Sequence, residues 1–348
     1  MKEVNPAAVT LARESRRLTQ QKLAHALEIS QGKLSKLENG QGEITEALLD
    51  KLASVLGYST SFFGEDLQVQ DLPEVFYRKL SRVTATDERA IRAHVNILRL
   101  GIGRLLKSVE VPTSRIPRVD LNAGETSPGH FARQLRAHWG IPRGPIANLT
   151  DVLERAGVLV VRCDFGEAAV DGLSMWYPAD GIPPMIFINA RRPGERSRFT
   201  LAHELAHLVF HYSHPIPSEY AEDEANSFAA ELLAPAVEVR PFLLNARFDD
   251  LFSMKRHWGV SMAFLLHRGE ELGRIPRWKA RKMWIEAGKL GYRTKEPFPI
   301  DAEEPTILKK LVKVHTEDLG YSDAELGELM FEARPHLSIE APRLRVVK

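Results

Sequence analysis

The stretch T-L-A-H-E-L-A-H, residues 200–207, carries the strongest chemical signal in the chain. His203 and His207 are four residues apart, so on a helix their imidazoles lie on one face, one turn apart. Two such nitrogens can bind one Zn²⁺ at about 2.0–2.1 Å. Glu204 follows the first histidine and is placed to act as general base toward a water molecule.

The residues around this stretch are apolar on nearly every side, which predicts a buried helix. A buried His-Glu-His set needs a chemical reason, because polar groups are costly to bury without partners. The pattern therefore predicts metal-dependent hydrolysis, with Glu204 as the catalytic residue. The competing interpretation is a pair of histidines that is solvated or paired within the core.

Composition describes an ordinary soluble protein. The 348 residues include 47 Lys and Arg and 46 Asp and Glu, a net charge of +1, so any DNA contact has to come from a local patch. The single cysteine, Cys163, cannot form an internal disulfide. We see no secretory h-region and no apolar stretch near the ~20 residues of a membrane span, and we expect a cytoplasmic protein with no membrane partner.

The first ~65 residues predict a series of short helices separated by turn signals. Thr19 and Ser30 are suitable N-caps for the second and third helices, and Asn39-Gly40 ends the third. A helix, a short turn and a helix form the helix-turn-helix arrangement, whose second member enters the major groove. The competing interpretation is a helical packing module with a solvated charged face.

The predicted DNA contacts come mainly from the third helix, residues 31–38. Gln31 and Lys33 are suited to base edges, and Lys36 is suited to phosphates. Arg13, Arg16 and Arg17 are further phosphate candidates. The predicted DNA-binding residues are Gln20, Gln31, Lys33, Ser35 and Lys36.

These residues resemble the XRE/Cro/lambda-repressor family, and the resemblance covers about one-sixth of the chain. It departs from the family at Glu28, where the turn usually has glycine. A left-handed backbone there is mildly strained for any other residue. The matching pattern is Thr19-Gln20-x-x-Leu23-Ala24 followed by Ile29-Ser30-x-x-x-Leu34-Ser35-x-x-Glu38-x-Gly40.

A run from residue 87 to 109 has apolar residues at helical spacing and predicts an amphipathic connecting helix, which offers its stripe to this chain or to a second copy. Prolines and glycines between 111 and 129 then predict a flexible joint. The predicted division is 1–66 for the helix-turn-helix domain, 67–128 for the helical linker and joint, 129–245 for the hydrolase domain, and 246–348 for a mostly helical C-terminal region.

The C-terminal two-thirds has α+β character. The pattern predicts strands at 158–162, 172–177 and 185–189, the last two as antiparallel neighbours. Helices are predicted at 131–139 and 146–156. In the tail, the run 255–271 gives the strongest helical signal.

A catalytic zinc site needs three protein ligands and an open position, and the H-E-x-x-H pattern supplies two ligands. The third is predicted on a downstream helix. At about 100° per residue, Glu222 shares the buried face of that helix, whereas Glu224 lies roughly 160° away. Glu222 is therefore the predicted third ligand, with Asn226, one turn on, as a hydrogen-bond partner of a ligand. Glu224 and His211 remain alternative ligands, His211 being better placed beside the site than in it.

An E-x-x-x-(D/N) spacing after H-E-x-x-H resembles the thermolysin-like zinc proteases. The wider pattern, from about residue 139 to 235, resembles the ImmA/IrrE family of metallo-endopeptidases, with Ala234-Pro235 where Met-Pro is commoner. A subset of that family carries an XRE domain, and this chain resembles that subset. The residues that carry the resemblance are R-F-T-L-A-H-E-L-A-H at 198–207 and E-x-x-A-N-x-F-A-A-E-L-L-A-P at 222–235.

The resemblance implies a lambda-repressor-like all-α domain followed by a gluzincin-like α+β peptidase domain with one Zn²⁺ per chain, Mn²⁺ and Fe²⁺ being alternatives. It also implies two kinds of partner, a double-stranded DNA operator and a cleaved protein such as an XRE-type repressor. Because such DNA-binding domains usually pair on two-fold sites, we expect a homodimer. The donor to the oxyanion stays open among Tyr177, His211 and Tyr212.

Two functions remain open from the sequence. In the first, a DNA-binding regulator carries a peptidase that hydrolyses a partner or itself in response to a cue. In the second, the peptidase fold serves as a sensor or dimerisation module of a transcription factor or antitoxin that cleaves nothing. An intact Glu204 favours the first, because a structural metal site needs no general base.

Overall fold

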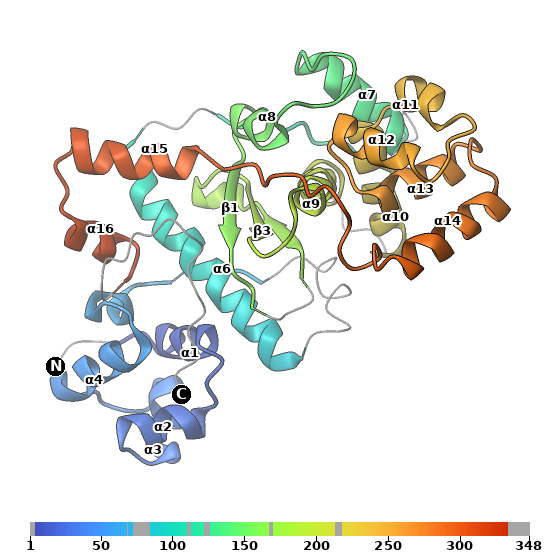
Figure 1. The fold of residues 1–348 in the computed structure, drawn as a ribbon. Coiled ribbons are helices and arrows are strands. Elements are labelled where there is room, and N and C mark those ends of the chain that lie inside the picture. Colours follow the sequence, from blue (N-terminus) through green and yellow to red (C-terminus); the bar gives the residue numbers. More distant parts are fainter. Residues whose placement is uncertain are drawn as a thin grey trace.

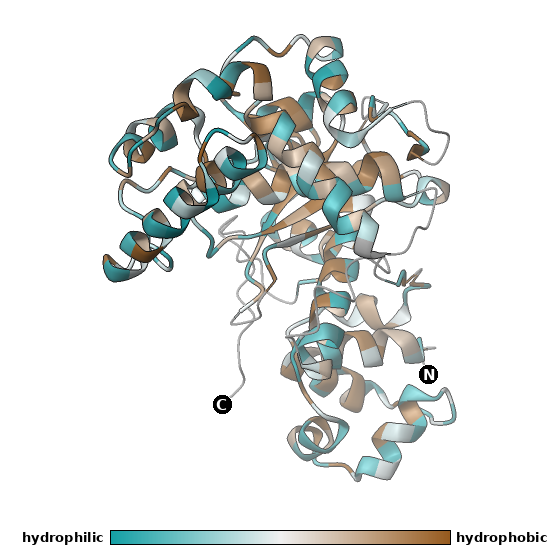
Figure 2. Cartoon of the chain, turned by 90° about the vertical axis from the view of Figure 1, so that its right-hand side faces the viewer, coloured by the Kyte–Doolittle hydropathy of each residue, from teal (hydrophilic) through white to brown (hydrophobic). Residues whose placement is uncertain are grey.

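The computed structural model describes residues 4–67, 69–71, 84–109, 113–121, 126–166, 170–212 and 218–332. A small helical body holds the N-terminal residues, and a larger α+β body holds most of the rest (Figure 1). The hydrophobic segments run through the interior of both bodies (Figure 2). No helix in the described residues is long and apolar enough to cross a membrane.

The N-terminal body is the predicted helix-turn-helix arrangement. The side chains of Thr19, Ser30 and Thr45 each accept a hydrogen bond from a backbone N–H in the first turn of the helix that follows, which satisfies donors that a helix leaves unpaired at its start. The helices are α1 (Pro6–Ser15), α2 (Gln20–Leu27), α3 (Gln31–Glu38) and α4 (Glu46–Leu56), followed by a 3₁₀ turn, η1 (Thr60–Gly64).

Glu28 adopts the left-handed backbone that the turn between α2 and α3 requires, with φ 57° and ψ 40°. Its carboxylate lies 2.9 Å from the Lys51 ammonium on α4. The turn therefore keeps its conformation without glycine, although an L residue is disfavoured there.

A three-stranded sheet, in the order β1-β3-β2, forms the centre of the larger body. β2 and β3 are antiparallel neighbours as predicted, and β1 runs parallel to β3. The strands read as continuous apolar runs because both faces of the sheet are covered by helices. The strands are β1 (Leu159–Cys163), β2 (Gly172–Met175) and β3 (Met185–Asn189).

Helix α9 (Gly194–Ala206) packs against β2 and β3, and it continues into a π-helical turn, η5 (His207–His211). Helix α10 (Ser218–Leu233) lies beside α9 and also packs on α7. The remaining elements of this region are α7 (Pro128–His138), α8 (Leu149–Arg155), the 3₁₀ turn η4 (Pro178–Asp180) and α11 (Ala236–Leu243).

The predicted connecting helix is α6 (Ala85–Leu106), and it packs on both bodies. Ala93 and Ile97 belong to the core of the N-terminal body, whereas Val95 and Ile102 pack with the residues of the sheet. The two bodies are therefore also joined by packing outside the predicted joint, because α6 precedes residues 111–128 and is buried against both neighbours. The flexibility of the joint itself stays a prediction. Residues 111–112 and 122–125 of that joint lie outside the described residues.

The predicted long helix at 255–271 is two helices. Gly259 adopts φ 65° and ends the first, and the Ser261 side chain caps the second. The helices here are α12 (Asp250–Trp258), α13 (Met262–Glu271) and α14 (Arg277–Lys289). Their buried faces share the hydrophobic cluster of α9 and α10, so the predicted boundary at residue 245 falls inside one packed body.

After α14 the chain returns across the larger body toward the N-terminal one (Figure 1). Along this path the Glu303 carboxylate accepts hydrogen bonds from the first backbone N–H groups of α8, at 3.0 and 2.7 Å. The path ends in α15 (Ile307–Lys313), the π-helical turn η6 (Val314–Asp318) and α16 (Asp323–Leu329).

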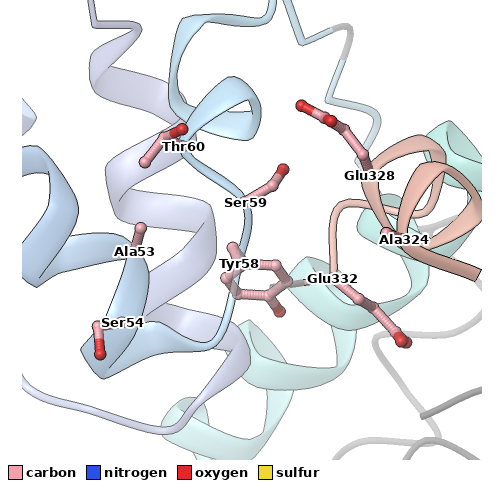
Figure 3. Close-up of a pocket in the computed structure, with 8 residues that line it drawn as sticks. All are labelled: Ala53, Ser54, Tyr58, Ser59, Thr60, Ala324, Glu328 and Glu332. Carbon is pink, nitrogen blue, oxygen red and sulfur yellow. The ribbon is translucent and has the colours of Figure 1, made fainter. Parts of the chain in front are cut away.

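Phe331, just after α16, is 1% exposed and lies in the core of the N-terminal body, with its ring 5.0 Å from that of Phe62. The Ser59 N–H donates to its carbonyl at 3.1 Å. Figure 3 shows a pocket of about 350 Å³ in this seam, with Tyr58 and Ser59 on one side and Glu328 and Glu332 on the other. The C-terminal part of the chain therefore ties the two bodies together.

Candidate metal centre

The predicted site lies on helix α9, which is buried along most of its length. His203 and Glu204 are 6% and 3% exposed. The helix begins at Gly194, where a Cβ would lie 2.4 Å from the carbonyl oxygens of Ile300 and Asp301, so only glycine admits the returning chain at this point.

His203, His207 and Glu222 converge. One ligand atom from each lies within 4.8 Å of the other two. The two Nε2 atoms are 3.0 Å apart, and the Glu222 carboxylate oxygens lie 3.5 Å from His203 Nε2 and 3.4 Å from His207 Nε2. The helical phasing that selected Glu222 from the sequence thus places its side chain at the two histidines.

Asn226 supports the first histidine from the opposite side of the ring. Its Oδ1 lies 3.1 Å from His203 Nδ1. An amide oxygen only accepts hydrogen bonds, so Nδ1 carries the proton and Nε2 keeps its lone pair directed at Glu222 and His207. This is the arrangement that a metal-binding imidazole requires.

The second histidine is supported through a chain of two further side chains. His207 Nδ1 lies 2.8 Å from His211 Nδ1, and His211 Nε2 lies 2.9 Å from Glu224 Oε2. Both rival ligands from the sequence therefore lie behind His207 rather than at the converging atoms. Burial lowers the pKa of His211, partly offset by Glu224, which favours a neutral ring that accepts from His207 and donates to Glu224.

The residues present fit a divalent metal ion. Two ligand atoms at about 2.0–2.1 Å from a tetrahedral ion are about 3.3–3.4 Å from each other, and the three separations here are 3.0, 3.4 and 3.5 Å. Two neutral imidazoles and one carboxylate are also a donor set that zinc accepts. Among the described residues, no other group of three His, Cys, Asp or Glu side chains meets in this way.

Glu204 projects from the same helix toward the sheet edge, where the Ser174 hydroxyl donates to its Oε2 at 2.9 Å. Ser174 lies on β2, 30 residues earlier, and its role was missed by the sequence analysis. The only available signal was a hydroxyl within an apolar strand, which does not identify its partner. The contact holds one carboxylate oxygen of Glu204 in a defined position.

Among the three oxyanion candidates, Tyr177 donates its hydroxyl to the Asp71 carbonyl and His211 is engaged with His207 and Glu224. Tyr212 directly follows His211 and is half-buried, and burial raises its pKa. Its ring lies 5.7 Å from that of Trp176, and the Arg118 guanidinium lies 4.2 Å from the Trp176 ring. No local pattern in the sequence indicated this cluster.

On α3, Gln31, Lys33 and Lys36 are exposed and available to a ligand, whereas Ser35 is half-buried. Gln20 donates to Glu38 at 2.8 Å, so its amide nitrogen is already engaged within the domain.

The three arginines proposed for phosphate contacts have internal partners instead, which corrects that expectation. Arg13 pairs with Glu38. Arg16 donates to the Leu56 carbonyl at 2.7 Å. Arg17 donates to the Phe165 carbonyl at 3.0 Å and pairs with Asp87 on α6, also at 3.0 Å.

Comparison with known families identifies both parts of the chain. A family model for a helix-turn-helix matches residues 10–63, and one for an IrrE N-terminal-like domain matches residues 153–270. Two stretches of the chain are therefore similar to a helix-turn-helix domain and to an IrrE N-terminal-like domain, a combination called the fusion below. The second match contains the H-E-x-x-H stretch and Glu222, and it extends past residue 245 through α13, as the packing does. No curated protein matches the fusion.

Proposed function

We propose that the fusion is a DNA-binding transcriptional regulator whose IrrE-type domain is a zinc-dependent endopeptidase. The observation that carries the proposal is the convergence of His203, His207 and Glu222 beside a buried Glu204. A site that only stabilised the fold would have no use for Glu204, whereas peptide hydrolysis requires a general base next to the metal.

In this proposal His203, His207 and Glu222 hold the ion, and Asn226 and His211 fix the two imidazoles. When bound, the divalent ion would supply Lewis-acid chemistry, which acidifies water and polarises the scissile carbonyl. Glu204 accepts the proton of the attacking water and returns it to the leaving amine. Ser174 keeps the Glu204 carboxylate aimed during both transfers by donating to Oε2.

The protein substrate we propose is an XRE-type repressor or the fusion itself, cut in response to a cue. Two features support a protein substrate that is bound to the same DNA. The helix-turn-helix and the peptidase domain share one chain, and α6 packs on both. When α3 binds an operator, the metal centre is therefore held close to the same DNA, where such repressors are also bound.

The test is cleavage by the full chain. The metal-loaded fusion is incubated with the XRE-type repressor encoded beside its gene, and new N-termini are read by mass spectrometry. We expect cleavage that stops when the metal is chelated. If Zn²⁺, Mn²⁺ and Fe²⁺ all give no product from the repressor, from cell extract or from the fusion itself, the peptidase fold acts as a sensor or dimerisation module.

For DNA we expect sequence-specific binding through α3 to a two-fold site by a dimer. Replacing Gln31 with alanine removes a base contact and should weaken operator binding by about 1–3 kcal/mol. Lys33→Ala also removes a base contact and should have an effect of the same size, whereas Lys36→Ala removes a phosphate contact and should lower the salt dependence of binding by about one unit of slope. Gel shifts measure both effects. Lys107→Ala, an exposed lysine at the end of α6, is the matched control, and an equal loss there contradicts the assignment of α3.

A further inference from the structure

The strongest positive charge in the chain lies outside the helix-turn-helix. Residues 274–295 contain eight Lys and Arg and one acidic residue, Glu286, whereas the whole chain has a net charge of +1. The rest of the chain is therefore net acidic. A local charge of this size on a nearly neutral protein creates a distinct electrostatic surface.

Helix α14 displays this charge on one face. Ala280, Met283 and Ala287 are buried against the larger body, so the opposite side of the helix faces solvent. The exposed side chains of that side are Arg277, Trp278, Arg281, Lys282, Ile285 and Lys289. We call this set the α14 face.

The cations of the α14 face have no acidic partner. Within the described part of the chain, none of its Arg or Lys side chains forms an ion pair, although Glu286 is exposed on the same helix. Of the acidic residues that flank α14, Glu271 pairs with Arg268 at 2.8 Å and Glu296 pairs with Lys255 at 2.8 Å. Trp278 is 63% exposed, and its ring has the Lys282 ammonium 5.2 Å from its centre. This face is therefore open for an anionic ligand.

The helix-turn-helix itself has little free positive charge. Residues 10–63 contain seven Lys and Arg against six Asp and Glu. Arg13, Arg16 and Arg17 have internal partners, and Lys51 pairs with Glu28. Phosphate neutralisation supplies most of the non-specific affinity for DNA, and this domain offers few cations for it.

We propose that the α14 face is a second DNA-binding surface, which contacts the phosphate backbone of duplex DNA without reading sequence. From Arg277 to Lys289 the row of cations spans about 18 Å at 1.5 Å per residue, which suits a linear polyanion with one charge per about 1.7 Å of duplex. α14 lies at the opposite side of the molecule from α3 (Figure 1), so it contacts DNA outside the stretch held by α3.

The test measures binding of the full chain to a random-sequence duplex of about 60 base pairs over a range of salt concentrations. The variant is the triple substitution Arg277→Gln, Arg281→Gln and Lys282→Gln. We expect the slope of log K against log salt to become shallower by about 2–3, since each neutralised phosphate contributes about 0.9. At low salt the affinity should fall by more than tenfold.

Helix α15 provides a matched control with the same charge change. Lys309, Lys310 and Lys313 are exposed, and two of them already face acids, Glu304 at 3.5 Å and Glu317 at 3.4 Å. Their triple glutamine variant should change the slope by less than half a unit.

Equal losses in the α14 and α15 variants, or no loss in the α14 variant with its helical content intact, overturn the proposal. Binding to an acidic protein or to a second copy in place of DNA overturns it as well. The assay uses random DNA and needs no metal, so it is independent of both cleavage and operator recognition.

Discussion

Replacing Glu204 with glutamine should lower the rate of peptide cleavage by about 10²–10⁴-fold, the usual contribution of a general base. The change keeps the shape of the side chain and removes its ability to accept a proton from water. Because the converging ligand atoms belong to His203, His207 and Glu222, metal content should be unchanged. Mass spectrometry measures the products formed from the repressor and from the fusion. Elemental analysis of the same samples measures the metal content.

The comparison variant is Ser174→Ala, which leaves the Glu204 carboxylate in place and removes the hydroxyl that donates to it. We expect a smaller loss, about 10–100-fold, since a hydrogen bond to a charged group contributes about 1.5–3 kcal/mol. If wild type and Glu204→Gln gave the same amount of product, Glu204 would have no part in the chemistry.

Removing any of the three converging side chains should lower the metal occupancy of the purified protein to a small fraction of the wild-type value. Structural zinc sites bind with about 10–16 kcal/mol shared among their ligands. At a comparable share for each ligand here, His203→Ala, His207→Ala or Glu222→Ala should weaken binding by about 10²–10³-fold. Purified wild type should carry about one divalent ion per chain. Elemental analysis and chelator competition measure the occupancy and the affinity of each variant.

Glu224→Ala is the matched control, because it removes the same group two residues from Glu222 on the same helix. Glu224 contacts His211 and not the converging atoms, so its loss should weaken metal binding by about tenfold, at the low end of the effect of partners outside the ligand set. If Glu224→Ala lost the metal while Glu222→Ala kept it, the assignment of the third ligand would be wrong.

Some features followed directly from local pattern. The four-residue spacing of His203 and His207 and the helical phasing of Glu222 and Asn226 each depend only on the geometry of one helix, and the structure brings these four side chains together. The antiparallel pairing of β2 and β3 was predicted in the same way, since a short loop joins two apolar runs. The two helix caps at Thr19 and Ser30 are also where the residues indicated.

Other features depended on residues that are far apart along the chain. The sequence predicts α6 as a connecting helix, because its apolar stripe does not indicate which segment packs on it. In the structure the stripe packs on two partners, the N-terminal core and the sheet. Arg17 was assigned to phosphate because an exposed-looking arginine close to a recognition helix suits DNA. Its real partners, Asp87 and Phe165, are 70 and 148 residues away.

The same distinction separates the parts of the metal centre. Helical periodicity alone selected Glu222 over Glu224, because a rotation of about 100° per residue is a local property of the backbone. Ser174 beside Glu204 and His211 joined to Glu224 required the packing of a strand and a second helix against α9. Such contacts depend on how buried surfaces pack in three dimensions. The order of residues in one segment does not determine which distant segment packs against it.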